Sequence, residues 1–140
     1  MSNEQTTFIM IKPDGVERGL ADEIIGRFEG IGLRMLAMWV GKPSLERAEA
    51  HYAVHKERPF YPDLIEFITS GTVVAMAWRG EDAIEASRRL IGATNWEDAE
   101  PGTIRADFAR SIDKNIIHGS DGEDTAAFEL GLWFPDGLED

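Results

Sequence analysis

The sequence predicts an α+β fold of the ferredoxin-like type, a βαββαβ sandwich in which helices cover one face of an antiparallel four-stranded sheet. Two observations predict it: short apolar runs have strand character, and the segments between them carry apolar residues at helical spacing. Extra helices precede the third strand, and a long loop precedes the last one. The length of 140 residues suits one domain, 1–140, with a single packed core.

The first strand is expected over residues 6–12, where every residue from Phe8 to Ile11 is apolar. A helix follows, because apolar residues recur at helical spacing from Leu20 to Phe28 and two glycines come after them. Residues 33–40 then form the second expected strand. The chain therefore opens with the strand, helix and strand of the predicted sandwich.

Two helical patches, residues 45–52 and 61–69, lead to a third strand over residues 72–78. Another helix opens at Asp82, and its inward face is expected to contain Ile84, Ser87 and Ile91. Residues 92–114 have little periodicity, so they are predicted to form a long loop. Long loops in compact domains are often functional.

The last part of the chain joins a short strand, Ile116–Ile117, to a histidine and a helix start. His118 is expected where the strand ends, so that its ring projects into a cleft. Ser120 followed by Glu123 is typical of a capping box, which would open a helix toward Leu132. Because a helix N-terminus favours a nearby anion, a histidine nucleophile beside it suggests phosphate chemistry.

The composition excludes several classes of partner. A formal net charge of −12 should repel nucleic acid and anionic membranes, so neither is an expected partner. Nucleotide binding then needs a local positive patch, which four residues could form: Lys12, Arg58, Arg88 and Arg105. The acid excess itself fits either a solubilising surface or adaptation to high salt.

Compartment is predicted from what the sequence lacks. The absence of cysteine excludes disulfides and thiolate metal sites. No apolar run approaches the length of a membrane span, and the first residues have no secretory signal. A cytoplasmic location is therefore expected.

Motifs along most of the chain, from about Thr6 to Phe134, match one known family in order and spacing. They are Phe8–Val16, Arg18–Leu20, His51–Tyr52, Arg58–Phe60, Phe67–Gly71, Gly92–Asn95, Pro101–Arg105 and Asn115–Asp121. With these motifs the chain closely resembles the nucleoside diphosphate kinases. The resemblance implies the ferredoxin-like fold and a homo-oligomer, either a dimer-based tetramer or a hexamer.

The resemblance also implies a reaction. His118 would take the γ-phosphoryl group from a nucleoside triphosphate, typically ATP, become a pros-phosphohistidine, and pass the group to a nucleoside diphosphate. This reversible ping-pong transfer would tolerate many bases and sugars. Glu129 would orient the His118 ring, Ser120 would lie beside both in addition to its capping role, and Lys12 would contact the transferring phosphate.

The remaining nucleotide contacts are also implied by the family. The phosphates would be bound by Lys12, Arg88, Arg105, Thr94 and Tyr52, the base by Phe60, Leu64 and Ile112, and the ribose by Asn115. An aromatic stack accepts purines and pyrimidines alike. From the residues alone, Phe60 and Leu64 could equally be core, Glu129 a solvated helix carboxylate and Arg88 a solvated helix residue.

For the metal, the resemblance implies Mg²⁺ near Asp121, held through water. His51 and His55 lie four residues apart on a predicted helix, but no third ligand is evident, so they are expected to be surface or packing residues. Val54 stands where many family members have an acidic residue that supports magnesium, which predicts weaker metal affinity. Thr72 and Trp96 replace usual prolines, a change that bears on assembly and loop stability.

The sequence disfavours three other functions. A metal-dependent phosphohydrolase would require clustered ligands, and the candidates are scattered along the sequence. A P-loop kinase is excluded because no Gly-x-x-x-x-Gly-Lys-[Ser/Thr] motif occurs. A non-catalytic nucleotide-binding or assembly module would be expected to lack the nucleophile or the phosphate clamps, and this chain has them all.

Overall fold

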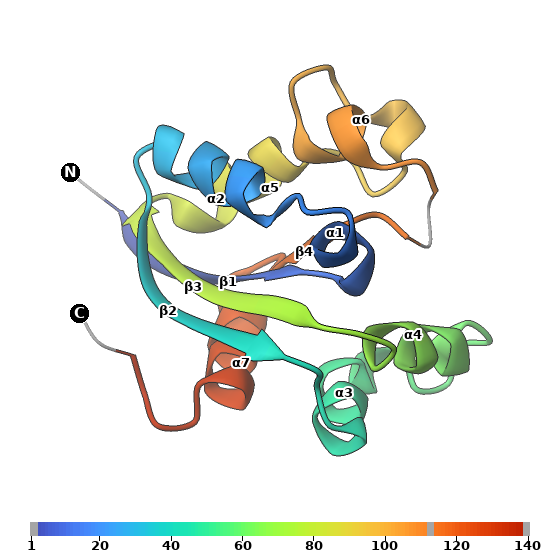
Figure 1. Ribbon diagram of the computed structural model, residues 1–140. Coiled ribbons are helices and arrows are strands. Elements are labelled where there is room, and N and C mark those ends of the chain that lie inside the picture. Colours follow the sequence, from blue (N-terminus) through green and yellow to red (C-terminus); the bar gives the residue numbers. More distant parts are fainter. Residues whose placement is uncertain (1–2, 112–113, 139–140) are drawn as a thin grey trace.

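The computed structural model describes residues 3–111 and 114–138 (Figure 1). The strands are β1 (Glu4–Ile11), β2 (Arg34–Gly41), β3 (Val73–Glu81) and β4 (Ile117–Gly119). The α-helices are α1 (Pro13–Glu17), α2 (Ala21–Gly30), α3 (Leu45–His51), α4 (Tyr61–Ile68), α5 (Ala83–Ile91), α6 (Ile104–Phe108) and α7 (Glu123–Trp133). Two 3₁₀ turns, η1 (Ala53–His55) and η2 (Trp96–Asp98), complete the described elements.

The strands form one sheet in the order β2-β3-β1-β4, and every described pairing in it is antiparallel. This arrangement confirms the predicted α+β class and the ferredoxin-like order of elements. Strand β3 runs three residues beyond its predicted end because it pairs with β1 as far as Glu4 and Glu81. Among the described residues, no helix combines the length and apolar character that crossing a membrane requires.

Helices cover both faces of the sheet, so the prediction that they cover a single face is wrong. Figure 1 shows α2 and α5 on one side of the sheet, with α3, α4 and α7 on the other. The alternation of β1 explains this arrangement: Ile9 and Ile11 pack into one buried cluster with α2 and α5, whereas Phe8 and Met10 pack into a second. A strand buried on both faces is apolar at every position, as β1 is from Phe8 to Ile11.

Two expectations about local structure are also wrong. Pro13, Asp14 and Gly15 are residues typical of a turn, but they begin the short helix α1, which tolerates a proline in its first turn because that N–H needs no helical partner. The predicted loop 92–114 contains η2 and α6, whose first turn is capped by the Thr103 hydroxyl accepting from the Ala106 N–H. These elements are too short to produce a periodic apolar signal.

Candidate active site

His118 lies in strand β4, and the residue just before this strand, Ile116, has a strained backbone conformation. His118 pairs with Met10 of β1, so it lies within the strand rather than at its end as predicted. Two residues earlier, Ile116 has a φ of 78°, a conformation that costs a β-branched residue about 1–3 kcal/mol. Contacts with the start of α1 hold it there: the Ile116 N–H donates to Asp14 and its carbonyl accepts from the Lys12 N–H.

The imidazole of His118 is anchored by a buried carboxylate. Its Nε2 atom lies 3.0 Å from both oxygens of Glu129, which is 4% exposed. An ionised carboxylate only accepts hydrogen bonds, so Nε2 carries the proton and Nδ1 keeps its lone pair. The interpretation of Glu129 as a solvated helix residue is therefore wrong.

The predicted capping role of Ser120 is wrong. Helix α7 is preceded by Gly122 and has no side-chain cap, and Glu123 instead accepts a hydrogen bond from Gln5. Ser120 is buried, and its hydroxyl donates to Glu129 Oε1 over 2.6 Å. The serine therefore supports the carboxylate that holds the imidazole, as the resemblance implied.

Cationic side chains gather beside the histidine. Lys12 follows β1 directly, is 9% exposed, and donates to Asn115 Oδ1 over 2.8 Å. The pKa of Lys12 is lowered to about 8, first by burial and then by the nearby charge of Arg105, with Asp14 acting in the opposite direction. Burial and the charge of Arg88 lower the pKa of Arg105 to about 10. A bound anion would stabilise the charged forms of Lys12 and Arg105, because it opposes both burial and the repulsion from neighbouring cations.

Two backbone carbonyls hold the guanidinium group of Arg105 in place. Its two terminal nitrogens donate to the carbonyls of Gly92 and Ile117, over 3.2 and 2.7 Å. Among the described residues its Nε has no hydrogen-bond partner. The guanidinium group is thus held in one orientation, and its Nε–H is not used in a hydrogen bond within the described residues.

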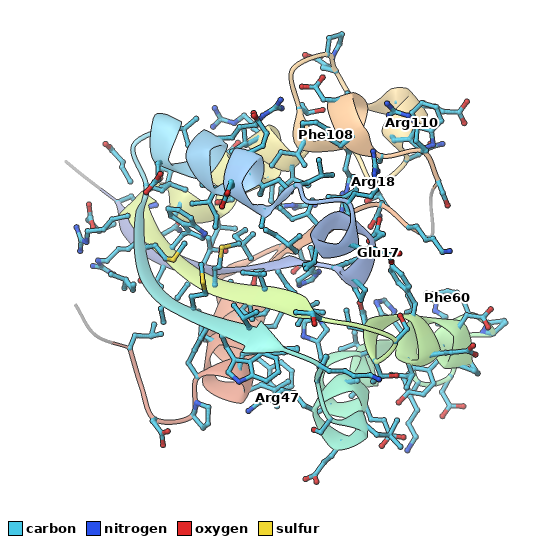
Figure 2. The ribbon with its side chains drawn as sticks, viewed as in Figure 1. Glu17, Arg18, Arg47, Phe60, Phe108 and Arg110 are labelled. Atoms are coloured by element: carbon cyan, nitrogen blue, oxygen red, sulfur yellow. The ribbon has the colours of Figure 1, made fainter. Side chains whose placement is uncertain are left out.

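The other predicted nucleotide contacts differ in exposure. Phe60 lies at the surface just before α4 and is 46% exposed, so its ring is accessible to a stacking partner (Figure 2). Leu64 packs on the second buried cluster, and Arg88 and Thr94 are exposed. Ile112, the residue predicted to lie opposite Phe60, falls outside the described residues.

Tyr52 keeps its phenolic proton. It is 8% exposed, and burial together with the charge of Glu129 raises its pKa. The ring of Tyr52 meets that of His51 edge-on, with centroids 4.8 Å apart. Its hydroxyl can therefore serve as a neutral donor, as the resemblance implied.

Asp121, which precedes α7, suits a magnesium ion held through water. Asp121 is exposed, and its Oδ1 accepts from the Thr125 hydroxyl over 2.6 Å, which leaves Oδ2 as an open carboxylate oxygen. Val54 is 86% exposed but offers no ligand atom. One carboxylate suits Mg²⁺, which keeps several waters and binds chiefly to phosphate oxygens.

His51 lies beside His118, a position that the sequence does not predict. It was expected to be a surface or packing residue, yet its ring lies 4.8 Å from that of His118, and ligand atoms of His51, His118 and Glu129 fall within 4.8 Å of one another. The indole N–H of Trp133 donates to His51 Nδ1, so the His51 proton is on Nε2, the nitrogen that a metal would need. The pattern of the sequence could not reveal this contact, because His51 and Glu129 meet only through folding.

Comparisons with known proteins point to one family. The family model for nucleoside diphosphate kinase matches residues 5–138. The nucleoside diphosphate kinase of Prochlorococcus marinus is 58% identical over 130 residues, which cover 93% of this chain and 86% of that protein. That of a Synechococcus species is 58% identical over 134 residues, covering 96% and 88%.

Solved structures show the same likeness. The halophilic nucleoside diphosphate kinase of Halobacterium salinarum, in complex with CDP, has a TM-score of 0.94 and 46% identity, covering 99% of this chain and 93% of that one. The enzyme of Encephalitozoon cuniculi has a TM-score of 0.94 and 44% identity, covering 100% and 93%. The chain therefore belongs to the nucleoside diphosphate kinase family, whose members transfer a phosphoryl group between nucleotides with the help of a divalent metal.

Proposed function

We propose that this enzyme exchanges the terminal phosphoryl group between nucleoside triphosphates and diphosphates through a phosphohistidine on His118. The observation that carries the assignment is the bond between His118 Nε2 and Glu129, because it leaves Nδ1 as the only ring nitrogen with a free lone pair. The intermediate is thus the pros isomer, phosphorylated on Nδ1.

In the first half-reaction, the Nδ1 lone pair attacks the γ-phosphorus of a nucleoside triphosphate such as ATP. A nitrogen–phosphorus bond forms, the bond from the γ-phosphorus to the β,γ-bridging oxygen breaks, and its electron pair leaves with the diphosphate. The Nε2 proton stays on the ring, so positive charge develops there and is balanced by the Glu129 carboxylate. In the second half-reaction, a terminal phosphate oxygen of another diphosphate attacks the same phosphorus, and the imidazole departs neutral.

Binding residues follow from charge and exposure. Lys12, Arg88 and Arg105 form a cationic cluster suited to the triphosphate, and Thr94 and Tyr52 add hydroxyl donors. Phe60 stacks on the base with Leu64 extending the apolar contact, and Asn115 contacts the ribose. Because stacking needs no particular base edge, broad base tolerance is expected.

Asp121 is the residue that would hold Mg²⁺, through water. When bound, the ion neutralises charge on the β- and γ-phosphates. The lack of an acidic residue at Val54 supports weak binding of the ion in the absence of nucleotide.

The active form is proposed to be a homo-oligomer, a dimer-based tetramer or a hexamer, in the cytoplasm. Strand β2 lies at an edge of the sheet, and its Met38 and Val40 are 44% and 57% exposed. An edge strand with exposed apolar side chains is a surface on which a second copy can pack. Sedimentation analysis of the wild type and of Val40→Glu tests this assignment, and an unchanged monomer in both would contradict it.

The reaction is tested by incubating the protein with γ-labelled ATP and magnesium, followed by intact-mass analysis and acid treatment. We expect one acid-labile phosphoryl group that is absent in His118→Ala and is discharged by GDP. Activity of His118→Ala within tenfold of the wild type would contradict the nucleophile assignment. Bound nucleotide without any phosphoenzyme would favour the non-catalytic module.

A further inference from the structure

Behind His118 lie two buried polar groups that the phosphoryl transfer, as described, does not use. They are Trp133 of α7 and His51 at the end of α3, and they lead to Glu129. The side chains of His51 and Glu129 are 1% and 5% exposed. Polar groups buried to this degree cost folding free energy unless they are paired. This cost suggests that the two groups serve a function.

The hydrogen bond from Trp133 fixes the tautomer of the His51 ring. An indole N–H can only donate, and it donates to His51 Nδ1 over 3.1 Å. In neutral imidazole the remaining proton is then on Nε2. That nitrogen faces Glu129 Oε2 at 3.7 Å, and among the described residues it has no hydrogen-bond partner. A movement of less than about 1 Å would bring it into hydrogen-bonding range of the carboxylate.

The surroundings of His51 keep it neutral. Burial holds its pKa well below the usual value, and the nearby charges of His118, Lys12 and His55 lower it further. The Tyr52 ring packs against its edge, and Glu129 is the anionic group that it faces. His51 therefore offers an uncharged N–H donor and does not compete with His118 as a cation.

We propose that His51 is a positioning residue that acts on the nucleophile through Glu129. With that small movement, its Nε2–H, directed by Trp133, adds to the donors that Ser120 and His118 already supply to the carboxylate. Donors on both carboxylate oxygens fix the orientation of Glu129, so the carboxylate stays directed at the ring and the proton stays on His118 Nε2. The phosphohistidine then keeps a protonated ring, and the imidazole leaves as a neutral group when the nitrogen–phosphorus bond breaks.

This role rests on the proposed function, and it is tested by single-turnover kinetics at saturating nucleotide. Two rates are measured in the intact enzyme: phosphoenzyme formation from ATP and discharge of the phosphoenzyme by GDP. His51→Leu removes the donor while filling similar space, and it should lower both rates by roughly 10-fold to 100-fold. The dissociation constants of the nucleotides should change less than about twofold, because His51 positions the nucleophile rather than the substrate.

Two further variants separate this role from a packing role. His51→Gln retains an N–H donor and should recover much of the rate lost in His51→Leu. Trp133→Phe keeps an aromatic ring but removes the donor that fixes the His51 tautomer, so it should lower both rates by several-fold. Trp78→Phe is the matched control: Trp78 is equally buried but packs in the other cluster, so its substitution should lower stability and leave both rates unchanged.

The outcomes are distinct. Rates in His51→Leu within twofold of the wild type, or a loss confined to nucleotide binding, would overturn the proposal, as would His51→Gln performing no better than His51→Leu. If His51→Leu does not fold, unchanged rates in Trp133→Phe overturn it. A wild-type enzyme that forms no phosphoenzyme would overturn the proposed function and this role with it, whereas normal wild-type phosphorylation with unaffected variants overturns this role alone.

Discussion

The two faces of the sheet use the same strand, β1, for different purposes. On one face, Ile9 and Ile11 pack in a cluster of aliphatic and aromatic residues under α2 and α5. On the other face, the ring of Phe8 touches a region that also buries Glu129 and His51. Burial of apolar surface stabilises both faces, and the second face also holds buried polar groups in fixed geometry behind a reactive side chain. The comparison separates residues that maintain the fold from residues that also shape the site.

The largest expected effect is a loss of stability when either of two buried phenylalanines, one on each face of the sheet, is replaced. Phe28 and Phe8 are both fully buried, so replacing either with alanine should lower the free energy of unfolding by about 3–5 kcal/mol. Phe28 stacks on Trp78, far from the chemistry, and its loss should leave turnover per folded molecule unchanged. The Phe8 ring lies 6.0 Å from that of His118, so Phe8→Ala should also reduce turnover.

Urea denaturation and steady-state kinetics, both at a temperature where the variants are folded, measure these two effects. An equal loss of turnover in Phe28→Ala and Phe8→Ala would show that the two faces are not functionally separate.

The next effect concerns charge on the second face. Glu129→Gln keeps the shape of the side chain but removes the negative charge that balances the imidazole during transfer. The expected fall in kcat is roughly 100-fold, in the range found when one transition-state partner is removed. Glu123→Gln, at the exposed start of the same helix, is the control and should not change kcat. A kcat for Glu129→Gln within threefold of the wild type would contradict the electrostatic role.

A smaller effect is expected where α1 meets Ile116. A Cβ atom added at Gly15 would lie 2.8 Å from Ile11 Cγ2 and 3.0 Å from Ile116 Cγ2. Gly15→Ala should therefore destabilise the protein by about 1–3 kcal/mol through overpacking. Gly26→Ala is the matched control, because its added Cβ meets nothing within 4 Å inside α2, and it should be neutral or stabilising by up to about 1 kcal/mol. Thermal unfolding compares them, and equal melting temperatures would contradict the close packing of α1.

The smallest effect is a pH dependence centred on Lys12. Its pKa of about 8 in the free enzyme means that its charge is lost as the pH rises past that value, so kcat/KM should fall by about tenfold one pH unit above it. Lys12→Arg should move this limb to higher pH. The sign for stability is opposite: the folded pKa lies below the ordinary value of 10.5, so the unfolded chain binds more protons between about pH 8 and 10.5, and this group's contribution to stability rises across that window. A flat kcat/KM profile to pH 10 would contradict the assignment.

Sequence reasoning succeeded where the signal is local or carried by a family motif. The apolar run from Phe8 to Ile11 predicts a strand because period and burial act on neighbouring residues. The helical spacing in residues 83–91 predicts which side chains of α5 turn inward, and Ile84, Ser87 and Ile91 are all buried. Short elements such as α1 and α6 were missed because one or two turns carry no measurable period.

What the sequence by itself determined is therefore the order of elements, the fold class and the identity of the family. Only the tertiary structure decided that Ser120 supports Glu129 instead of capping α7, and that helices cover both faces of the sheet. It also brought His51 and Trp133, which are 82 residues apart in the chain, within 3.1 Å. The physical reason is that periodicity and capping are interactions between near neighbours in sequence, whereas the direction of a buried proton depends on partners that meet only when the sheet and its helices pack.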